Sequence, residues 1–248
     1  MMNSEKPLFT WFGPWGLPVQ VMPSTAFLLL LFVGLSAGSV EEMAWGLNMF
    51  AIVVVAIFLH ELGHAWGAHV QGITVHRIVL HGGGGFCEHR SAGAYASELI
   101  VLMGPLLNLA LWAVLSLGAW TMLPDFPGYE ATDEVWEAFF AANATRFEVI
   151  YWLETAARIN LMLFALNMIP VQPLDGGKLL HLLLLRVMRQ DLALTVVGGF
   201  GLVCTLLWVP AMIGMYWYIG FVLLFFPSLR MHWEMLRGGA RLRRLDRR

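Results

Sequence analysis

The chain has 248 residues, of which 58% are hydrophobic and only 13% are charged, and its mean hydropathy is +0.68. Soluble domains average roughly 45–50% apolar and about 25% charged residues, so this composition excludes an ordinary soluble domain and indicates a protein of the lipid bilayer. The formal net charge of −2 excludes a basic nucleic-acid-binding domain, and two cysteines exclude a disulfide scaffold.

Apolar segments of the length needed to cross a bilayer recur along the chain. A helix needs about 20 apolar residues to span roughly 30 Å of hydrocarbon. Segments of this kind lie at 17–38, 44–70, 94–123 and 149–169. The longer apolar stretch 192–226 contains Pro210, at which we divide it into two short spans. The sequence therefore predicts an all-α polytopic membrane protein with about six transmembrane helices.

The distribution of charge predicts the orientation of these spans. Lys and Arg concentrate in cytoplasmic loops, and here they follow the second and fourth spans, whereas acidic residues follow the first and third. The tail 230–248 carries seven arginines and lies on the basic side if six spans precede it. We therefore expect both termini to be cytoplasmic. The polar connection 124–148 has aromatic residues at helical spacing, which predicts a short interfacial helix on the other surface.

The second predicted span contains the sequence HELGH, which places His60, Glu61 and His64 inside an apolar helix. Ionisable side chains at that depth cost at least a few kcal/mol each, which indicates a function. Residues four apart share a helix face, so both imidazoles can bind one metal ion. HExxH is the zinc-binding pattern of metalloproteases, in which the glutamate is the general base. The alternative is a polar helix seam in which each histidine bonds a neighbouring helix.

A third zinc ligand must come from elsewhere, because catalytic zinc has three protein ligands and an open position for water. Asp175 lies in NMIPVQPLDGGKLL, where the fourth span ends and a glycine pair permits close approach of the backbone to another element. By the predicted topology it lies at the depth of His60. Taken alone, Asp175 is also a candidate N-cap of a helix over 176–189.

Three motifs together resemble the site-2 protease family of intramembrane zinc metalloproteases: HELGH, GPLLN at 104–108, and NMIPVQPLDGG at 167–177. The resemblance covers about residues 58–178. It implies that His60, His64 and Asp175 bind one zinc ion per chain and that Glu61 is the catalytic base.

The same resemblance implies roles for Asn108 and for a glycine-rich segment. Asn108 matches a family position that faces the active site, as a substrate or oxyanion contact. From their place in the fourth span, Asn160 and Asn167 are predicted to form interhelical hydrogen bonds, and Asn167 is also a candidate for shaping the site. The segment 81–85, after the β-like GITVHRIVLH, is similar to the strand-and-loop insertion that engages unwound substrate. We therefore add a short β-strand and glycine-rich insertion after the second span to the predicted fold.

The domain organisation follows from these assignments. We predict a single integral membrane protease domain over 1–248, with a core at about 44–190, flanking spans at 17–38 and 192–226, and a basic tail at 230–248. The implied partners are a transmembrane protein substrate and the lipid bilayer, with no nucleic acid, in a multi-pass protein of a bacterial cell membrane. No residue specifies an oligomeric state.

Two alternative functions use the same residues differently. A membrane metal-ion transporter or sensor would bind the ion without hydrolysis, and it would have no need of Glu61 as a base. A metalloprotease of the prenyl-protein type would use a glutamate as third ligand, for which Glu98 and Glu154 are poor candidates because no histidine pattern follows either. The predicted activity is hydrolysis of a peptide bond in or near a transmembrane segment.

Overall fold

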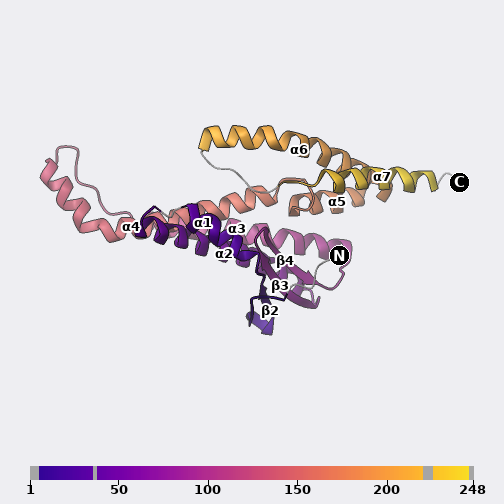
Figure 1. Ribbon diagram of the computed structural model, residues 1–248, viewed down its shortest axis with the longest axis horizontal. Coiled ribbons are helices and arrows are strands. Elements are labelled where there is room, and N and C mark those ends of the chain that lie inside the picture. Colours follow the sequence, from indigo (N-terminus) through magenta and orange to yellow (C-terminus); the bar gives the residue numbers. More distant parts are fainter. Residues whose placement is uncertain (1–5, 36–37, 220–225, 246–248) are drawn as a thin grey trace.

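The computed structural model describes residues 6–35, 38–219 and 226–245 (Figure 1). Besides a short 3-10 helix at Pro14–Gly16, the elements in chain order are β1 Phe9–Phe12, β2 Pro18–Val21, α1 Thr25–Leu35, α2 Val40–His69, β3 Val75–His81, β4 Gly84–His89, α3 Ala94–Thr121, α4 Asp133–Asn167, α5 Asp175–Val187, α6 Gln190–Ile219 and α7 Leu229–Leu245.

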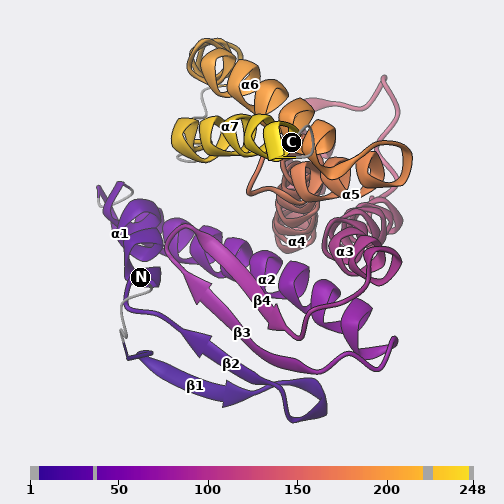
Figure 2. The ribbon, with the colours of Figure 1, turned by 90° about the vertical axis from the view of Figure 1, so that its right-hand side faces the viewer.

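Helices dominate the described chain, but a four-stranded sheet lies along α2 (Figure 2). The strand order is β1-β2-β3-β4, with β2 and β3 parallel and the two outer pairs antiparallel. The strand and glycine-rich turn predicted after the second span are present as β3, β4 and the turn between them. The expectation of an all-α fold is corrected by the two N-terminal strands β1 and β2, which extend this insertion into a sheet.

Four described helices are long and apolar enough to cross a membrane by length and composition: α2, α3, α4, and the part of α6 from Gln190 to Gly214. The predicted count of about six is therefore not confirmed. The predicted first span, 17–38, is wrong as one helix, because 18–21 form β2 and α1 has 11 residues. A helix of that length rises only about 16 Å. Apolarity alone does not separate a buried strand followed by a short helix from one span.

Two further expectations about helix boundaries are corrected. Helix α6 continues through Pro210 as one helix of 30 residues, so the predicted division there is wrong. Proline is tolerated inside membrane helices, where neighbouring groups satisfy the freed backbone carbonyl. The predicted separate interfacial helix within 124–148 is the first half of α4, which is continuous from Asp133 to Asn167 and extends beyond the neighbouring helices (Figure 1). The end of the predicted span 192–226 includes residues 220–225, which lie outside the described part.

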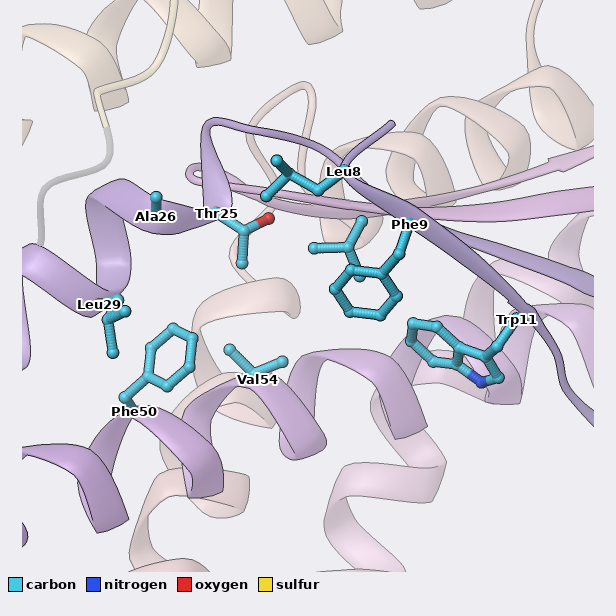
Figure 3. Close-up of a pocket in the computed structure, with 9 residues that line it drawn as sticks. Leu8, Phe9, Trp11, Thr25, Ala26, Leu29, Phe50 and Val54 are labelled. Atoms are coloured by element: carbon cyan, nitrogen blue, oxygen red, sulfur yellow. The ribbon is translucent and has the colours of Figure 1, made fainter. Parts of the chain in front are cut away.

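The sheet packs on α2 through small and branched apolar side chains. Val19, Ile78 and Leu80 of the strands and Ala65 of α2 belong to one buried cluster. Farther toward the start of α2, an apolar cavity of about 580 Å³ separates α1, α2 and the N-terminal strands, with Phe9 and Phe50 among its lining residues (Figure 3). The sheet thus covers the face of α2 that includes Glu61.

Glycine allows α2 and α3 to approach each other closely. A Cβ added at Gly63 would lie 2.5 Å from the Met103 carbonyl oxygen, and one at Gly67 would lie 3.1 Å from the Ile100 Cα. The backbones therefore pack in direct contact beside the HELGH segment, as small residues permit at membrane helix interfaces.

Candidate metal centre

Helix α2 brings the first two candidate ligands together. His60 and His64 are one turn apart on the same face, and both are buried. Their Nε2 atoms lie 3.1 Å apart. The i, i+4 spacing in the sequence therefore produces the shared face that the motif predicts.

Asp175 enters this pair from the first residue of α5. Its Oδ2 atom lies 3.0 Å from His60 Nε2 and 3.1 Å from His64 Nε2. Leu174, not Asp175, occupies the N-cap position of α5, so the N-cap alternative is wrong. The side chain is directed at the histidines instead.

The glycine pair after Asp175 fixes the start of α5. A Cβ at Gly176 would lie 2.4 Å from the Met168 carbonyl oxygen, and one at Gly177 would lie 2.4 Å from the Val171 carbonyl carbon. The first turn of α5 therefore packs directly on the preceding backbone, which no residue with a side chain would allow. This contact places Asp175 opposite α2.

The three side chains fit a metal ion. Two imidazole nitrogens and one carboxylate oxygen are a donor set of catalytic zinc, whose bonds of about 2.0–2.2 Å place tetrahedral ligand atoms about 3.3 Å apart. The observed separations of 3.0–3.1 Å are close to that value. Within the described part of the chain, His60, His64 and Asp175 are the group of three ligand side chains that could hold an ion.

Backbone and amide oxygens hold both imidazoles in the tautomer needed for ligation. His64 Nδ1 donates to the Ile100 carbonyl at 2.7 Å, and His60 Nδ1 donates to Asn108 Oδ1 at 2.5 Å. With Nδ1 protonated, each Nε2 presents its lone pair to the centre. Such outer partners orient histidine ligands and raise their basicity.

Asn108 lies behind His60, not at a surface open to substrate. It is fully buried, and its Nδ2 atom donates to Asn160 Oδ1 at 2.8 Å. The sequence predicted Asn160 as an interhelical hydrogen-bonding residue, and this bond confirms that prediction. Both ends of the Asn108 amide are therefore used within the protein, an arrangement that favours orientation of His60 over a contact with substrate.

Asn167 does not join this network through any hydrogen bond described in the structure. Its Nδ2 atom donates to the Leu163 carbonyl at 3.0 Å, one turn earlier in α4. This bond is of the helix-internal kind that asparagine makes near a helix end. The predicted contribution of Asn167 to the site stays a prediction.

Glu61 is buried beside the two histidines and faces the glycine-rich strand β4. A Cβ at Gly85 would lie 2.7 Å from Glu61 Cγ and 3.2 Å from Glu61 Oε1. The backbone of β4 therefore packs directly against the proposed base. Gly85 belongs to the glycine-rich segment 81–85 of the predicted strand-and-loop insertion, but the sequence did not indicate its contact with Glu61.

Cys87 of β4 also lies near Glu61, and burial raises the pKa of its thiol to about 12, with the Glu61 charge adding to the effect and the Lys178 charge opposing it. The thiolate is the reactive form, so we expect alkylation of Cys87 by iodoacetamide at pH 8 to be at least about 100-fold slower than that of an ordinary thiol. Mass spectrometry of the Cys87 peptide measures the rate. An exposed cysteine introduced by Ser91→Cys is the reference, and equal rates at the two positions would contradict the burial of Cys87.

The two glutamates considered as alternative third ligands form ion pairs with arginines instead. Glu98 forms a two-point ion pair with the Arg186 guanidinium, and Glu154 pairs with Arg158 at 3.8 Å. Neither glutamate belongs to the metal centre, which removes the support for a glutamate as third ligand.

Two contacts of the centre were not identified from the sequence. The Ile100 carbonyl orients His64, but a backbone oxygen leaves no sequence signal. Gly104 packs against the His64 ring, where an added Cβ would lie 2.4 Å from Cε1 and Nε2. The motif GPLLN contained this signal, since a glycine inside a span indicates a close contact.

The sequence profile of peptidase family M50 matches residues 48–207. A zinc metalloprotease of Methanocaldococcus jannaschii is 27% identical over 169 residues, which cover 68% of this chain and 43% of the relative. A protein of Synechocystis sp., provisionally assigned as a zinc metalloprotease, is 32% identical over 180 residues, covering 66% of this chain and 41% of the relative. The chain thus spans about two fifths of the length of the curated relatives that it matches.

The solved structure of a site-2 protease from Methanocaldococcus jannaschii superimposes with a TM-score of 0.58 and 21% sequence identity, over 94% of each chain. Because the match covers 94% of this chain, the similarity extends well beyond the three motifs. It shows a shared fold.

Proposed function

The chain belongs to peptidase family M50, the site-2 protease family, and from this premise we propose that it is an intramembrane zinc metalloendopeptidase. The proposed reaction is hydrolysis of a peptide bond in or near a transmembrane segment of a membrane-protein substrate. The observation that carries the proposal is the convergence of the His60, His64 and Asp175 ligand atoms within 3.1 Å, with Glu61 next to them on a membrane helix.

The proposed chemistry divides between the ion and the chain. Zinc, when bound, polarises a carbonyl and makes water more acidic. Glu61 accepts the proton of the attacking water and later delivers it to the leaving amine, because a carboxylate beside the first ligand is within reach of both. Asn108 and the Ile100 carbonyl keep the two imidazoles aligned during this exchange. Burial of the centre excludes bulk water, which strengthens these electrostatic interactions.

A substrate helix must unwind before hydrolysis, because its amides are hydrogen-bonded within the helix. Unwound backbone can add to the free edge of a sheet. The sequence predicts that the strand-and-loop insertion after the second span engages substrate, but its first strand, β3, is paired on both sides, by β2 and β4. Strand β4 is at the edge of the described sheet and contains Gly85, which touches Glu61. We therefore assign the proposed substrate contact to β4.

Metal removal tests the proposal on the purified chain in detergent or lipid. We expect about one zinc per chain, loss of cleavage of a transmembrane peptide after treatment with 1,10-phenanthroline, and recovery on addition of zinc. Metal analysis and mass spectrometry of the products provide the two readouts. Cleavage that persists after complete zinc removal would contradict the proposal, as would a native chain that binds no zinc.

We also propose where the chain lies in the cell. Four apolar helices and membership in a membrane protease family support an integral membrane protein. The distribution of Lys and Arg supports our proposal that both termini are cytoplasmic. We also propose that the membrane is that of a bacterial cell.

A further inference from the structure

The two oxygens of the Asp175 carboxylate have different partners. Oδ2 faces His60 and His64 at 3.0 and 3.1 Å, whereas Oδ1 accepts a hydrogen bond from Lys178 Nζ at 2.9 Å. Asp175 is buried, and the Lys178 side chain is 47% exposed. One oxygen is therefore available to the metal centre and the other is held on the opposite side.

The ion pair is built into the first turn of α5. Lys178 follows Asp175 by three residues, so the two side chains lie on the same face of the helix. Gly176 and Gly177, between them, pack on the preceding backbone and fix this turn. Lys178 also lines a cavity of about 330 Å³ between α3 and α5, together with His181. Its ammonium group therefore reaches Asp175 from the rim of this cavity.

The Lys178–Asp175 pair differs from an ordinary surface ion pair because Asp175 is a buried candidate metal ligand. Exposed pairs at this spacing contribute little to stability. Here the carboxylate is buried, so loss of the lysine would leave Oδ1 as a buried acceptor without its partner. A free Oδ1 has a favourable alternative, which is to turn toward the metal.

We propose that Lys178 is a positioning residue that restricts Asp175 to ligation through Oδ2 alone, a proposal that rests on the proposed function. Carboxylates bind metal ions through one oxygen or through both. Catalytic zinc needs one position free of protein ligands. By holding Oδ1 away, Lys178 keeps Asp175 from occupying the position required by the reactants.

Cobalt substitution tests the inference without relying on activity. Visible absorption by Co²⁺ becomes weaker as the number of ligands rises from four to five. We expect Lys178→Met to bind about one Co²⁺ per chain with weaker absorption than the native protein, and its kcat with zinc to fall at least 10-fold with KM little changed. Lys178→Arg, which retains a cationic donor, should keep the native spectrum. His181→Gln is the matched control on the same helix and cavity, and it should also be native in both measurements.

The outcomes separate this inference from the proposed function. A native chain that binds no Co²⁺ would contradict the metal centre itself. A native spectrum in Lys178→Met, with Co²⁺ bound, would overturn only the role of Lys178. If Lys178→Met does not fold, as judged by circular dichroism, Lys178→Leu provides a second neutral variant without a hydrogen-bond donor. Failure of both neutral variants to fold, while Lys178→Arg is native, would show a structural role and also overturn the proposal.

Discussion

Replacing Glu61 with glutamine is expected to lower kcat for peptide-bond hydrolysis by a factor of about 10²–10⁴, the usual contribution of a general base. Glutamine keeps the size and burial of the side chain but cannot accept the proton of the attacking water. His60, His64 and Asp175 are unchanged, so zinc content should stay near one per chain. Single-turnover cleavage of a transmembrane peptide and metal analysis of the same preparation measure the two quantities.

Glu234→Gln provides the control for this change. Glu234 lies on α7, is exposed, and pairs with Arg230, so its replacement should leave both zinc content and cleavage near native values. Full activity in Glu61→Gln would contradict the assignment of the base. Stoichiometric zinc in the native chain without cleavage of any substrate would favour the metal transporter or sensor that the sequence left open.

Introducing a methyl group at Gly104 is expected to remove zinc, because its Cβ would lie 2.4 Å from Cε1 and Nε2 of His64. That ring cannot retreat easily, since its Nδ1 atom is bound to the Ile100 carbonyl at 2.7 Å and Gly63 packs on the Met103 backbone. Loss of an aligned ligand should weaken zinc binding at least as much as loss of an outer partner, which costs about 10–100-fold. We therefore expect zinc content and cleavage to fall together in Gly104→Ala.

Gly118→Ala separates this steric effect from the general effect of alanine. Gly118 lies on the same helix, α3, but an added Cβ there meets nothing within 4 Å. Alanine stabilises a helix interior by roughly 0.5–1 kcal/mol relative to glycine, so Gly118→Ala should keep zinc and activity. Competition with a fluorescent zinc chelator measures affinity in both variants. Native zinc affinity in Gly104→Ala would show that the His64 ring has room to move, contrary to the packing of α3.

Local sequence patterns predicted the metal-binding side chains more completely than they predicted the groups that orient them. The i, i+4 histidines share a helix face in any helix, so HELGH was sufficient to place two ligand atoms together. Asp175 was found because a zinc site needs a third ligand and because a glycine pair indicated close packing. Asn108 was identified as important, but its position behind His60 depends on how α3 crosses α2, for which no local pattern exists.

Errors in the predicted fold have a common physical origin. Residues 17–38 are predominantly apolar, and the burial of β2 against α2 favours the same kind of residues as a membrane span. Pro210 indicated a break, yet α6 is continuous through it. In a membrane helix, neighbouring groups can satisfy the backbone carbonyl that proline leaves without a hydrogen bond. In both cases the outcome depends on neighbouring elements, not on the segment itself.

The sequence by itself determined that this chain is a membrane protein, that α2 presents His60, Glu61 and His64 together, and that a strand follows it. These features depend on composition and on contacts within one or two turns. Only the tertiary structure decided which oxygen of Asp175 faces the histidines, which groups orient the imidazoles, and that β4 is an edge strand of the described sheet. Such contacts join residues separated by tens of positions, and they are set by how closely the backbones of α2, α3 and α5 can pack.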